Sequence, residues 1–453
     1  MKQQKVPRVT AAVRSSPWTW MVAIAAVSAT STSAHAQWSQ FGGPNRNFTV
    51  DAKGLADKWP EEGPRRIWER DLGDGYATIV VDNGVLYTMY RKDADEFTVA
   101  LDAKTGETIW EHGNPSPFTK LMAEYGPGPH STPLIVGNRL YTIGTNSVMH
   151  CFNKKTGRVL WKHDLVDEFG APIPGRGYAS SPIAYKNTVI VPVDRPRKDQ
   201  EGQSEGDAEA TAETKEPPEA QTLIAFDQET GAVVWKALDF AVSYSSPILI
   251  TLDGEDQLVL FTAQDLIGVD PDNGALLWSH PFHTQYGANI STPLWNGEDL
   301  LFCSAAYGSG ARVIRLRRDG GKTVTEELWH SRKMRIHHGN VIAIGDYVYG
   351  SSGDSGPAFF IGINIRNGKV AWRERGFTKA NCVYADGKVI ILDEDGQLGL
   401  ATVTPKGMTV HSRCTVAERY AWAAPTLVGK TLFVRDRKKI MALDLGRSWA
   451  APD

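Results

Sequence analysis

The sequence predicts an all-β protein, namely an eight-bladed β-propeller of four-stranded antiparallel blades, with the ring closed by N- and C-terminal strands in one blade. Three observations lead to this fold class. A turn followed by a tryptophan recurs at a fixed spacing, and short alternating strands precede each copy. The last copy also lacks a strand, which a segment near the N-terminus supplies.

The clearest copy of the repeat runs from Asp102 to Trp110, with Gly106 four residues after the Asp and four before the Trp. The same spacing recurs in four further segments, with Asp or Asn first: 153–161, 227–235, 270–278 and 364–372. Asp or Asn opens a tight turn by bonding to its own backbone, and Gly closes the turn with a positive φ. Each copy is therefore interpreted as a β-hairpin whose second strand carries the Trp.

Two further short strands precede each hairpin, as at 132–136 and 139–143. Four short antiparallel strands in a unit of roughly 40 residues are typical of a propeller blade. One unit has a lengthened turn at 319–321, and the next-to-last unit has His411 where the others have Trp. The positions that correspond to the Trp are residues 68, 110, 161, 235, 278, 329, 372 and 411, which makes eight blades.

The two ends of the chain are expected to share the eighth blade. The final unit, 426–444, ends after three strands, and the segment 66–69, which contains Trp68, is predicted as an outer strand with no blade before it. Joining them closes the ring and protects the sheet edges. We expect the seven Trp side chains of the repeat to wedge against neighbouring blades, with stacking on a ligand as the alternative.

Residues 1–36 are predicted to be a secretory signal peptide. Basic residues, an apolar run from Trp18 to Val27 and a final Ala-His-Ala at 34–36 are the parts of such a signal. An uncleaved membrane anchor is the alternative, but the run has about ten residues, whereas a membrane span needs roughly 20. We therefore expect residues 37–453 to form a single monomeric propeller domain, periplasmic or secreted, with no membrane insertion after cleavage.

The charge balance gives no reason to expect a nucleic-acid partner. The chain carries 49 Lys and Arg against 52 Asp and Glu, a net charge of −3, whereas a polyanion binder needs a strong basic bias. An acidic insert, 195–221, interrupts the third blade, and its part 199–219 has eight acids, one Lys and no aromatic residue. We predict that this insert is disordered, because it cannot bury enough apolar surface to fold. Binding of calcium or of a partner is the alternative.

The residues just before each innermost strand form the candidate binding site, because they surround the channel mouth, where propellers bind small molecules. Aromatic, amide and imidazole side chains dominate this set: Tyr76, His130, Tyr178, Tyr244, Asn289, His338, Asn340, Asn381 and Trp422. Carboxylates are missing from it, while Arg176 and Arg335 lie nearby. Such groups suit a planar anion, a quinone or a sugar ring, but not Ca²⁺, which needs several carboxylate oxygens. The alternative is that they bond only water and backbone.

Three histidines near the mouth, His130, His337 and His338, have the chemistry to hold a transition metal. Adjacent residues of a strand point to opposite faces, so we expect at most one of His337 and His338 to face the channel, and we assign no metal site. Asp354 is a candidate catalytic base, with a role in a turn as the alternative. No hydrolase or phosphate-cradling signature is present.

The pattern A-x-D-x-x-T-G-x-x-x-W, present at 100–110 and 225–235, resembles the pyrroloquinoline-quinone (PQQ) repeat. That repeat builds the eight-bladed propellers of quinoprotein alcohol dehydrogenases and of the outer-membrane assembly lipoprotein BamB. The segment 38–46, Trp-Ser-Gln-Phe-Gly-Gly-Pro-Asn-Arg, is also similar to the start of soluble, exported PQQ-repeat proteins. The resemblance covers almost all of residues 37–453 and implies the propeller fold.

For activity, the resemblance implies oxidation of alcohols or aldose sugars by PQQ with calcium, with PQQ stacked between a Trp and a disulfide of two adjacent Cys. The four cysteines here, Cys151, Cys303, Cys382 and Cys414, are never adjacent, and no C-x-x-C-H haem motif is present. Similarity to BamB implies scaffolding, although the lipid-bearing Cys of that family is missing.

The leading expectation is an exported binding or scaffold module that holds a small molecule or an envelope protein at its channel mouth, with no cofactor assigned. The alternative is a PQQ-dependent oxidoreductase acting on an alcohol or aldose sugar. In that case PQQ and calcium would lie among Asn289, Asn340 and Trp422.

Overall fold

The structure is a computed structural model that describes Met1 and residues 38–117, 125–194, 221–354 and 357–447. The predicted signal peptide, 1–36, and the predicted disordered insert, 195–221, lie outside the described residues except for Met1 and Gln221. In the part that is described, no helix is long and apolar enough to span a membrane.

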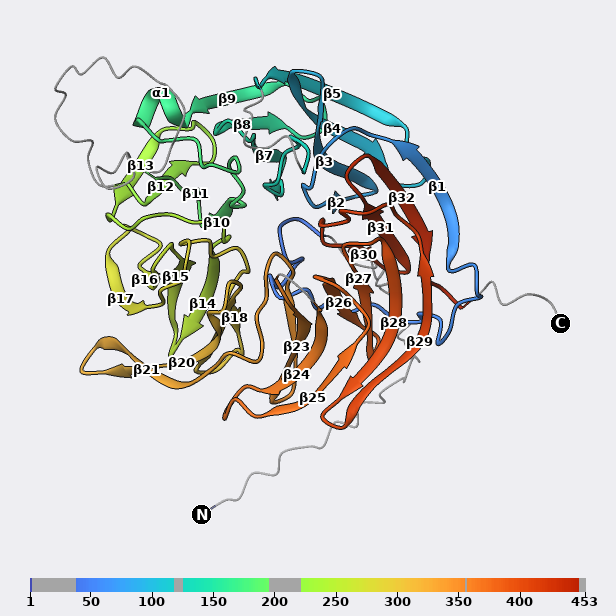
Figure 1. Cartoon of the computed structure of the whole chain (residues 1–453). Coiled ribbons are helices and arrows are strands. Elements are labelled where there is room, and N and C mark those ends of the chain that lie inside the picture. The colour runs from blue at the N-terminus through green and yellow to red at the C-terminus, as the bar shows by residue number, and fades with distance from the viewer. Residues whose placement is uncertain (2–37, 118–124, 195–220, 355–356, 448–453) are drawn as a thin grey trace. The chain divides into compact units, whose positions relative to one another are not determined.

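The described residues form eight four-stranded antiparallel sheets, which are the blades of a ring (Figure 1). Blade 1 contains β2 (Val80–Asp82), β3 (Val85–Lys92), β4 (Asp95–Asp102) and β5 (Thr108–Pro115). Blade 2 contains β6 (Leu134–Val136), β7 (Arg139–Ile143), β8 (Val148–Asn153) and β9 (Val159–Asp164), and is followed by the short helix α1 (Leu165–Phe169). Blade 3 contains β10 (Ile183–Tyr185), β11 (Thr188–Pro192), β12 (Leu223–Asp227) and β13 (Val233–Ala237). Blade 4 contains β14 (Ile248–Leu252), β15 (Glu255–Phe261), β16 (Asp265–Val269) and β17 (Leu276–Pro281).

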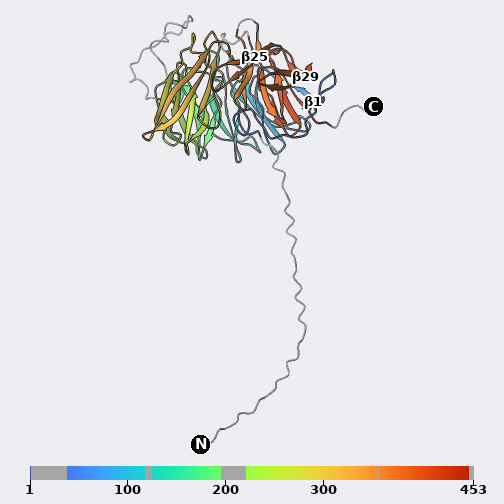
Figure 2. The ribbon, with the colours of Figure 1, turned by 90° about the horizontal axis from the view of Figure 1, so that it is seen from below.

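The remaining blades complete the circle, and the side view shows their strands crossing the thickness of the ring (Figure 2). Blade 5 contains β18 (Leu294–Trp295), β19 (Leu300–Ala305), β20 (Gly310–Asp319) and β21 (Lys322–Ser331). Blade 6 contains β22 (Val341–Ile344), β23 (Tyr347–Ser352), β24 (Phe359–Asn364) and β25 (Val370–Arg375). Blade 7 contains β26 (Asn381–Ala385), β27 (Lys388–Leu392), β28 (Gln397–Thr404) and β29 (Gly407–Thr415). Blade 8 contains β30 (Thr426–Val428), β31 (Thr431–Arg435), β32 (Lys439–Asp444) and, from the other end of the chain, β1 (Arg65–Asp71).

Blade 8 confirms the predicted closure of the ring. β1 pairs antiparallel with β32 from Arg65 opposite Asp444 to Asp71 opposite Lys439. An ion pair of 2.8 Å between Arg65 and Asp444 marks one end of this pairing. Because β1 covers the open edge of β32, the two ends of the chain hold the ring shut.

Tryptophans on the outermost strands link each blade to the next. Five indole N–H groups donate to backbone carbonyls in the following blade: Trp68 to Ala103 at 3.0 Å, Trp110 to Lys154 at 2.8 Å, Trp161 to Gln228 at 3.3 Å, Trp329 to Ile365 at 2.7 Å and Trp372 to Thr404 at 2.7 Å. A Cβ added to the turn glycine Gly106 would lie 2.7 Å from the Trp68 ring, so a side chain there would clash with the indole. Trp235 packs in the same way on Gly274. These six Trp residues, called the outer tryptophan ring below, confirm the predicted wedging between blades.

Two positions depart from the predicted pattern. Trp278 donates instead to Gln257 of its own blade at 2.8 Å, because the next blade has the longer hairpin β20–β21 in place of the usual turn. His411 was expected at the Trp position of blade 7, but Ser412 pairs with Leu400 there and His411 is the extra residue of a β-bulge. The prediction was one residue off because Gly407 begins β29 after a tight turn, whereas in the other copies Gly lies within the turn.

The segment 38–50 crosses the ring on the face opposite the channel mouth, where the innermost strands end. Trp38 forms a bridge with Val81 of blade 1, and the carbonyl of Ser39 accepts from Ile135 N of blade 2 at 2.8 Å. Val50 N donates to Tyr384 O of blade 7 at 3.0 Å. Trp38 is fully buried. The N-terminal segment therefore ties three blades together beneath the channel.

Candidate functional site

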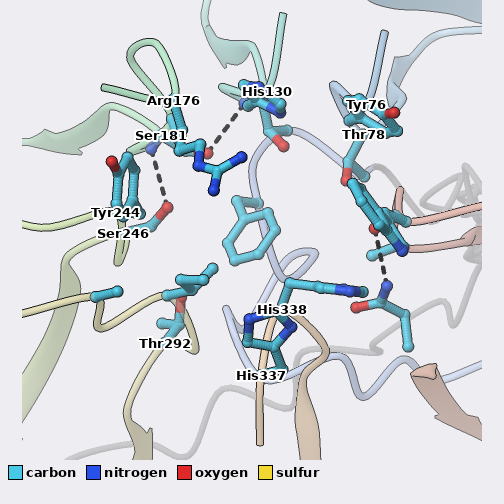
Figure 3. A pocket seen from close by; sticks show the side chains of 18 of the residues that line it. Tyr76, Thr78, His130, Arg176, Ser181, Tyr244, Ser246, Thr292, His337 and His338 are labelled. Atoms are coloured by element: carbon cyan, nitrogen blue, oxygen red, sulfur yellow. Dashed lines mark hydrogen bonds between the residues drawn. The ribbon is translucent and has the colours of Figure 1, made fainter. Parts of the chain in front are cut away.

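A cavity of about 660 Å³ lies where the innermost strands begin (Figure 3). Side chains from all eight blades and their connecting loops line it: Phe41, Tyr76, Thr78, Tyr125, His130, Thr132, Arg176, Ala179, Ser181, Tyr244, Ser246, Tyr286, Ala288, Ile290, Thr292, Tyr307, His337, His338, Lys379, Asn381, Trp422 and Ala424. Phe41 belongs to the segment that crosses the ring, so this segment forms part of the cavity floor.

The structure brings six of the nine predicted mouth residues together in this cavity: Tyr76, His130, Tyr244, His338, Asn381 and Trp422. The expectation that only one of His337 and His338 faces the channel is wrong, because both line the cavity. These two residues lie in a bend before β22, and the alternation of a strand does not apply to them.

The other three predicted residues do not line the cavity, because each is engaged in hydrogen bonds within the scaffold. The hydroxyl of Tyr178 donates to Pro192 O at 2.9 Å. The Asn289 amide donates to Thr262 O at 2.7 Å. Asn340 bonds the backbone of Cys382 in the next blade through both ends of its amide, at 2.9 Å to the carbonyl and 2.7 Å from the N–H.

Sequence reasoning missed a set of hydroxyl side chains that lie two residues before the innermost strands: Thr78, Thr132, Ser181, Ser246 and Thr292. In four blades this residue is followed by Pro, and that Ser/Thr-Pro pair is the signal that aligns the mouth positions. Counting back two residues from each pair reaches cavity-lining residues, for example Ala179 and Ile290. Tyr178 and Asn289 are each one residue away from this register, and neighbouring side chains of an extended segment point to opposite sides.

Seven aromatic rings form a continuous arc around the mouth, called the aromatic belt below. The consecutive ring-centre distances are 5.2 Å for His130–Tyr76, 5.1 Å for Tyr76–Trp422, 4.7 Å for Trp422–His338, 4.9 Å for His338–His337, 5.3 Å for His337–Tyr307 and 5.1 Å for Tyr307–Tyr286. Rings at such spacings support one another in place. The belt therefore presents a fixed aromatic wall to a molecule in the cavity.

Trp422 is held by groups from blade 7. Asn381 Nδ2 donates to Trp422 O at 2.9 Å, and the indole N–H of Trp422 donates to Glu394 at 3.1 Å. The Glu394 carboxylate also pairs with Lys379 Nζ at 3.3 Å. Backbone and indole are thus both fixed, and the positive charge of Lys379 is partly balanced outside the cavity.

The mouth histidines are neutral at pH 7. Burial lowers the pKa of His130 to about 4, and burial together with the nearby positive charge of Lys379 lowers the pKa of His337 to about 4. Burial lowers the pKa of His338 as well. His337 Nε2 lies 2.8 Å from the hydroxyl of Tyr307. His337 Nδ1 and both ring nitrogens of His338 are buried with no hydrogen-bond partner among the described residues.

Two cations line the cavity from opposite sides of the ring: Arg176 lies before blade 3 and Lys379 lies before blade 7. Arg176 extends into the open space between His130, Tyr244 and His338 (Figure 3). Its guanidinium lies 5.7 Å from the ring centre of Tyr125. Among the described residues that line the cavity, none is Asp or Glu. The lining therefore combines cations, neutral imidazoles, hydroxyls and aromatic faces.

Asp354, the candidate catalytic base, does not line the cavity. Its carboxylate accepts from Tyr307 N at 2.7 Å and pairs with Arg335 at 3.4 Å, so it positions the loop that carries Tyr307. Within the described residues, no cluster of three or more His, Cys, Asp or Glu is arranged to hold a metal ion.

A family model described as outer membrane protein assembly factor BamB matches residues 94–374. No curated protein matches the chain significantly. Among solved structures, BamB from Moraxella catarrhalis aligns with 14% identity over 84% of this chain and 99% of that chain, with a TM-score of 0.57.

Two quinohemoprotein alcohol dehydrogenases are also structurally similar. The enzyme from Comamonas testosteroni aligns with 12% identity over 92% of this chain and 82% of that chain, with a TM-score of 0.59. ADHIIG from Pseudomonas putida HK5 aligns with 12% identity over the same shares and a TM-score of 0.60. At such identities these likenesses show a shared propeller fold.

Proposed function

Since the chain belongs to the PQQ-repeat propeller family whose model is described as outer membrane protein assembly factor BamB, we propose that it is an exported binding module for a small organic molecule. The ligand occupies the cavity at the channel mouth. A volume of about 660 Å³ lies within the usual range for small-molecule sites.

The observation that carries this proposal is the set of unpartnered imidazole nitrogens. Both ring nitrogens of His338 and Nδ1 of His337 are buried without a partner among the described residues. A buried polar group with no partner costs about 1–3 kcal/mol. A molecule that bonds these nitrogens and covers the aromatic belt removes that cost.

The lining does not fit calcium-assisted chemistry on PQQ. Calcium takes six to eight oxygen ligands, among them carboxylates, and no described lining residue is acidic. Cys151, Cys303 and Cys382 are buried within blades 2, 5 and 7, and Cys414 is part of β29, so none of the four lines the cavity. We therefore favour binding over PQQ-dependent oxidation of an alcohol or aldose sugar, which remains the alternative.

The test combines calorimetry and thermal shift on the purified protein with a panel of organic acids, sugars and PQQ, with and without Ca²⁺. We expect one or more panel members to bind with 1:1 stoichiometry. The variant His338→Phe keeps the ring and removes both nitrogens, so it should weaken this binding. The control His283→Phe changes an exposed histidine outside the cavity and should leave binding unchanged.

Two results would contradict the proposal. One is the absence of binding by every panel member in the wild-type protein. The other is stoichiometric binding of PQQ with Ca²⁺, accompanied by dye reduction with ethanol or glucose, which would establish the oxidoreductase instead.

A scaffold role is the second candidate, and apolar side chains exposed on the outermost strands favour it. Ile109 on β5, Val234 on β13 and Leu276 on β17 are 49%, 50% and 44% exposed. Scattered exposed apolar residues are common on soluble proteins, so this observation is weaker than the cavity. A specific envelope partner should be recovered by the wild type and lost with Val234→Asp while the melting temperature stays unchanged.

A further inference from the structure

We infer that the ligand of the cavity is an acidic sugar, that is, a sugar ring that carries a carboxylate or phosphate group. This inference rests on the proposed binding function. It follows from three features of the lining: the donor–acceptor pair on His338, the aromatic belt and the guanidinium of Arg176.

The two ring nitrogens of His338 are best satisfied by hydroxyl groups of a ligand. A neutral imidazole has one N–H donor and one acceptor nitrogen, and both nitrogens of His338 are unpartnered among the described residues. Carboxylates and quinone carbonyls only accept hydrogen bonds, so neither satisfies the acceptor nitrogen. A hydroxyl both donates and accepts, and neighbouring hydroxyls of a sugar are able to bond both sides of such a ring.

The aromatic belt provides a surface for the ring of the sugar. The C–H groups on a sugar face carry partial positive charge, which is attracted to the negative face of an aromatic ring. Trp422 lies between Tyr76 and His338 in the belt, at 5.1 Å and 4.7 Å between ring centres. A sugar stacked on this part of the belt is therefore close to the unpartnered nitrogens of His338.

Hydroxyl side chains also line the cavity and extend the polar contacts. Thr132 N donates to Ser181 Oγ at 3.0 Å, and Ser181 N donates to Ser246 Oγ at 2.9 Å. These bonds leave the hydroxyl protons of Ser181 and Ser246 available for a ligand, since each oxygen is used there as an acceptor. Small, fixed hydroxyls of this kind suit a polyhydroxylated molecule better than an apolar one.

Arg176 is the reason to expect a carboxylate or phosphate group on the ligand. Its guanidinium enters the cavity, and none of the described residues that line the cavity is Asp or Glu. Lys379, the other cation of the lining, is already paired with Glu394 at 3.3 Å. A planar guanidinium binds carboxylate or phosphate through two parallel hydrogen bonds. Arg176 is therefore the group that distinguishes an acidic sugar from a neutral one.

The experiment measures Kd by calorimetry at low salt for D-glucuronate, D-galacturonate, D-glucose 6-phosphate, D-glucose and PQQ. We expect at least one of the three acidic sugars to bind about 10- to 100-fold more tightly than glucose, because hydrogen bonds to a charged group are stronger than neutral ones. A preference for the uronates identifies a carboxylate, and a preference for the 6-phosphate identifies a phosphate. Added salt should weaken binding of the acidic sugars and leave glucose unchanged.

Two variants separate the charge from the rest of the site. Arg176→Gln should raise the Kd of the preferred acidic sugar about 10- to 100-fold and leave the Kd of glucose unchanged. Arg158→Gln, an exposed arginine on a turn outside the cavity, is the matched control and should change neither. His338→Phe should weaken the acidic sugar and glucose alike. Arg176 is exposed, so its replacement leaves the fold intact, which an unchanged melting temperature verifies.

The outcomes distinguish this inference from the proposed function. If glucose binds as tightly as the acidic sugars, or if Arg176→Gln has no effect, the inference fails and the binding function stands. The same holds if PQQ or another panel member binds while no sugar does. If no compound binds at all, both fail.

Discussion

The outer tryptophan ring and the residues at the channel mouth come from the same blades, yet they are built on opposite principles. On the outside, one residue type makes one contact again and again, as Trp110 does to Lys154 O at 2.8 Å and Trp329 does to Ile365 O at 2.7 Å. At the mouth, equivalent positions hold different side chains: Tyr76, His130, Ala179, Tyr244, Ile290, His338, Lys379 and Trp422.

This difference separates what maintains the fold from what determines binding. Neighbouring blades pack against each other in the same way at each junction, so the same Trp contact stabilises nearly all of the junctions. A ligand in the central cavity has no eightfold symmetry, so each blade must contribute its own group. Repetition of a side chain around a propeller therefore indicates structure, and variation at a repeated position indicates function.

The largest effect is expected from removing the N-terminal part of the chain, which contributes Trp68 to the outer tryptophan ring, Phe41 to the cavity and β1 to blade 8. Deleting residues 38–71 removes β1, the Trp68 contact and the segment that crosses the ring below the cavity. Loss of a buried Trp alone costs about 3–5 kcal/mol, and this deletion removes the buried Trp38 and Trp59 as well. Because whole proteins are stable by only about 5–15 kcal/mol, we expect loss of cooperative unfolding in calorimetry.

A shorter deletion, of residues 38–50 only, is the control for this experiment. It leaves β1 paired with β32 and should give a folded protein with a lower melting temperature. An unchanged melting temperature in the 38–71 deletion would contradict the closure of the ring by the two chain ends.

Within the outer tryptophan ring, Trp110→Ala should lower the free energy of unfolding by about 3–5 kcal/mol, measured by urea denaturation. The indole packs on Gly157 of blade 2 as well as bonding Lys154, and both contacts disappear. The Kd of a cavity ligand should change by less than about twofold, because Trp110 does not line the cavity. A large change in the Kd with little change in the free energy of unfolding would mean that the outer tryptophan ring takes part in ligand binding, which would contradict the separation of the two sets of residues.

The fold was predictable because its signals repeat. Gly106 and its equivalents mark the turns, the Trp follows at fixed spacing, and the missing strand of the last unit matches the segment around Trp68. The prediction failed where the repeat itself changes. Blade 7 has a tight turn before Gly407, which shifts the Trp position from His411 to Ser412.

The cavity was only partly predictable, because an error of one residue turns a side chain from the cavity into the scaffold. The sequence predicts Tyr178 and Asn289 at the mouth, whereas their neighbours Ala179 and Ile290 line the cavity. Tyr286 and Tyr307 lie on connections between strands that carry no repeat, so no spacing rule locates them. Their place in the aromatic belt follows only from the packing of the folded chain.

The smallest expected effect is a pH dependence of the free energy of unfolding that arises from buried histidines at the mouth. Unfolded histidines bind protons near pH 6.5, whereas burial holds the pKa of His130 and His337 at about 4 in the folded protein. Between these values the unfolded chain binds more protons, so the free energy of unfolding falls as the pH drops from 6.5 towards 4. Below pH 4 this contribution no longer changes, since both states are protonated.

The mouth histidines supply one part of this pH dependence, and His150 on β8, outside the cavity, supplies another, because burial lowers its pKa to about 4 as well. In His337→Asn/His338→Asn, the decrease in melting temperature from pH 7 to pH 4.5 should be smaller than in the wild type, because two of the groups that resist protonation are gone. Trp110→Ala and His283→Asn should keep the full wild-type decrease while starting from their own melting temperatures. Equal decreases in the double variant and the wild type would mean that the mouth histidines are protonated as readily in the folded protein as in the unfolded chain. In that case they would not be the neutral donor–acceptor groups on which recognition of a sugar hydroxyl depends.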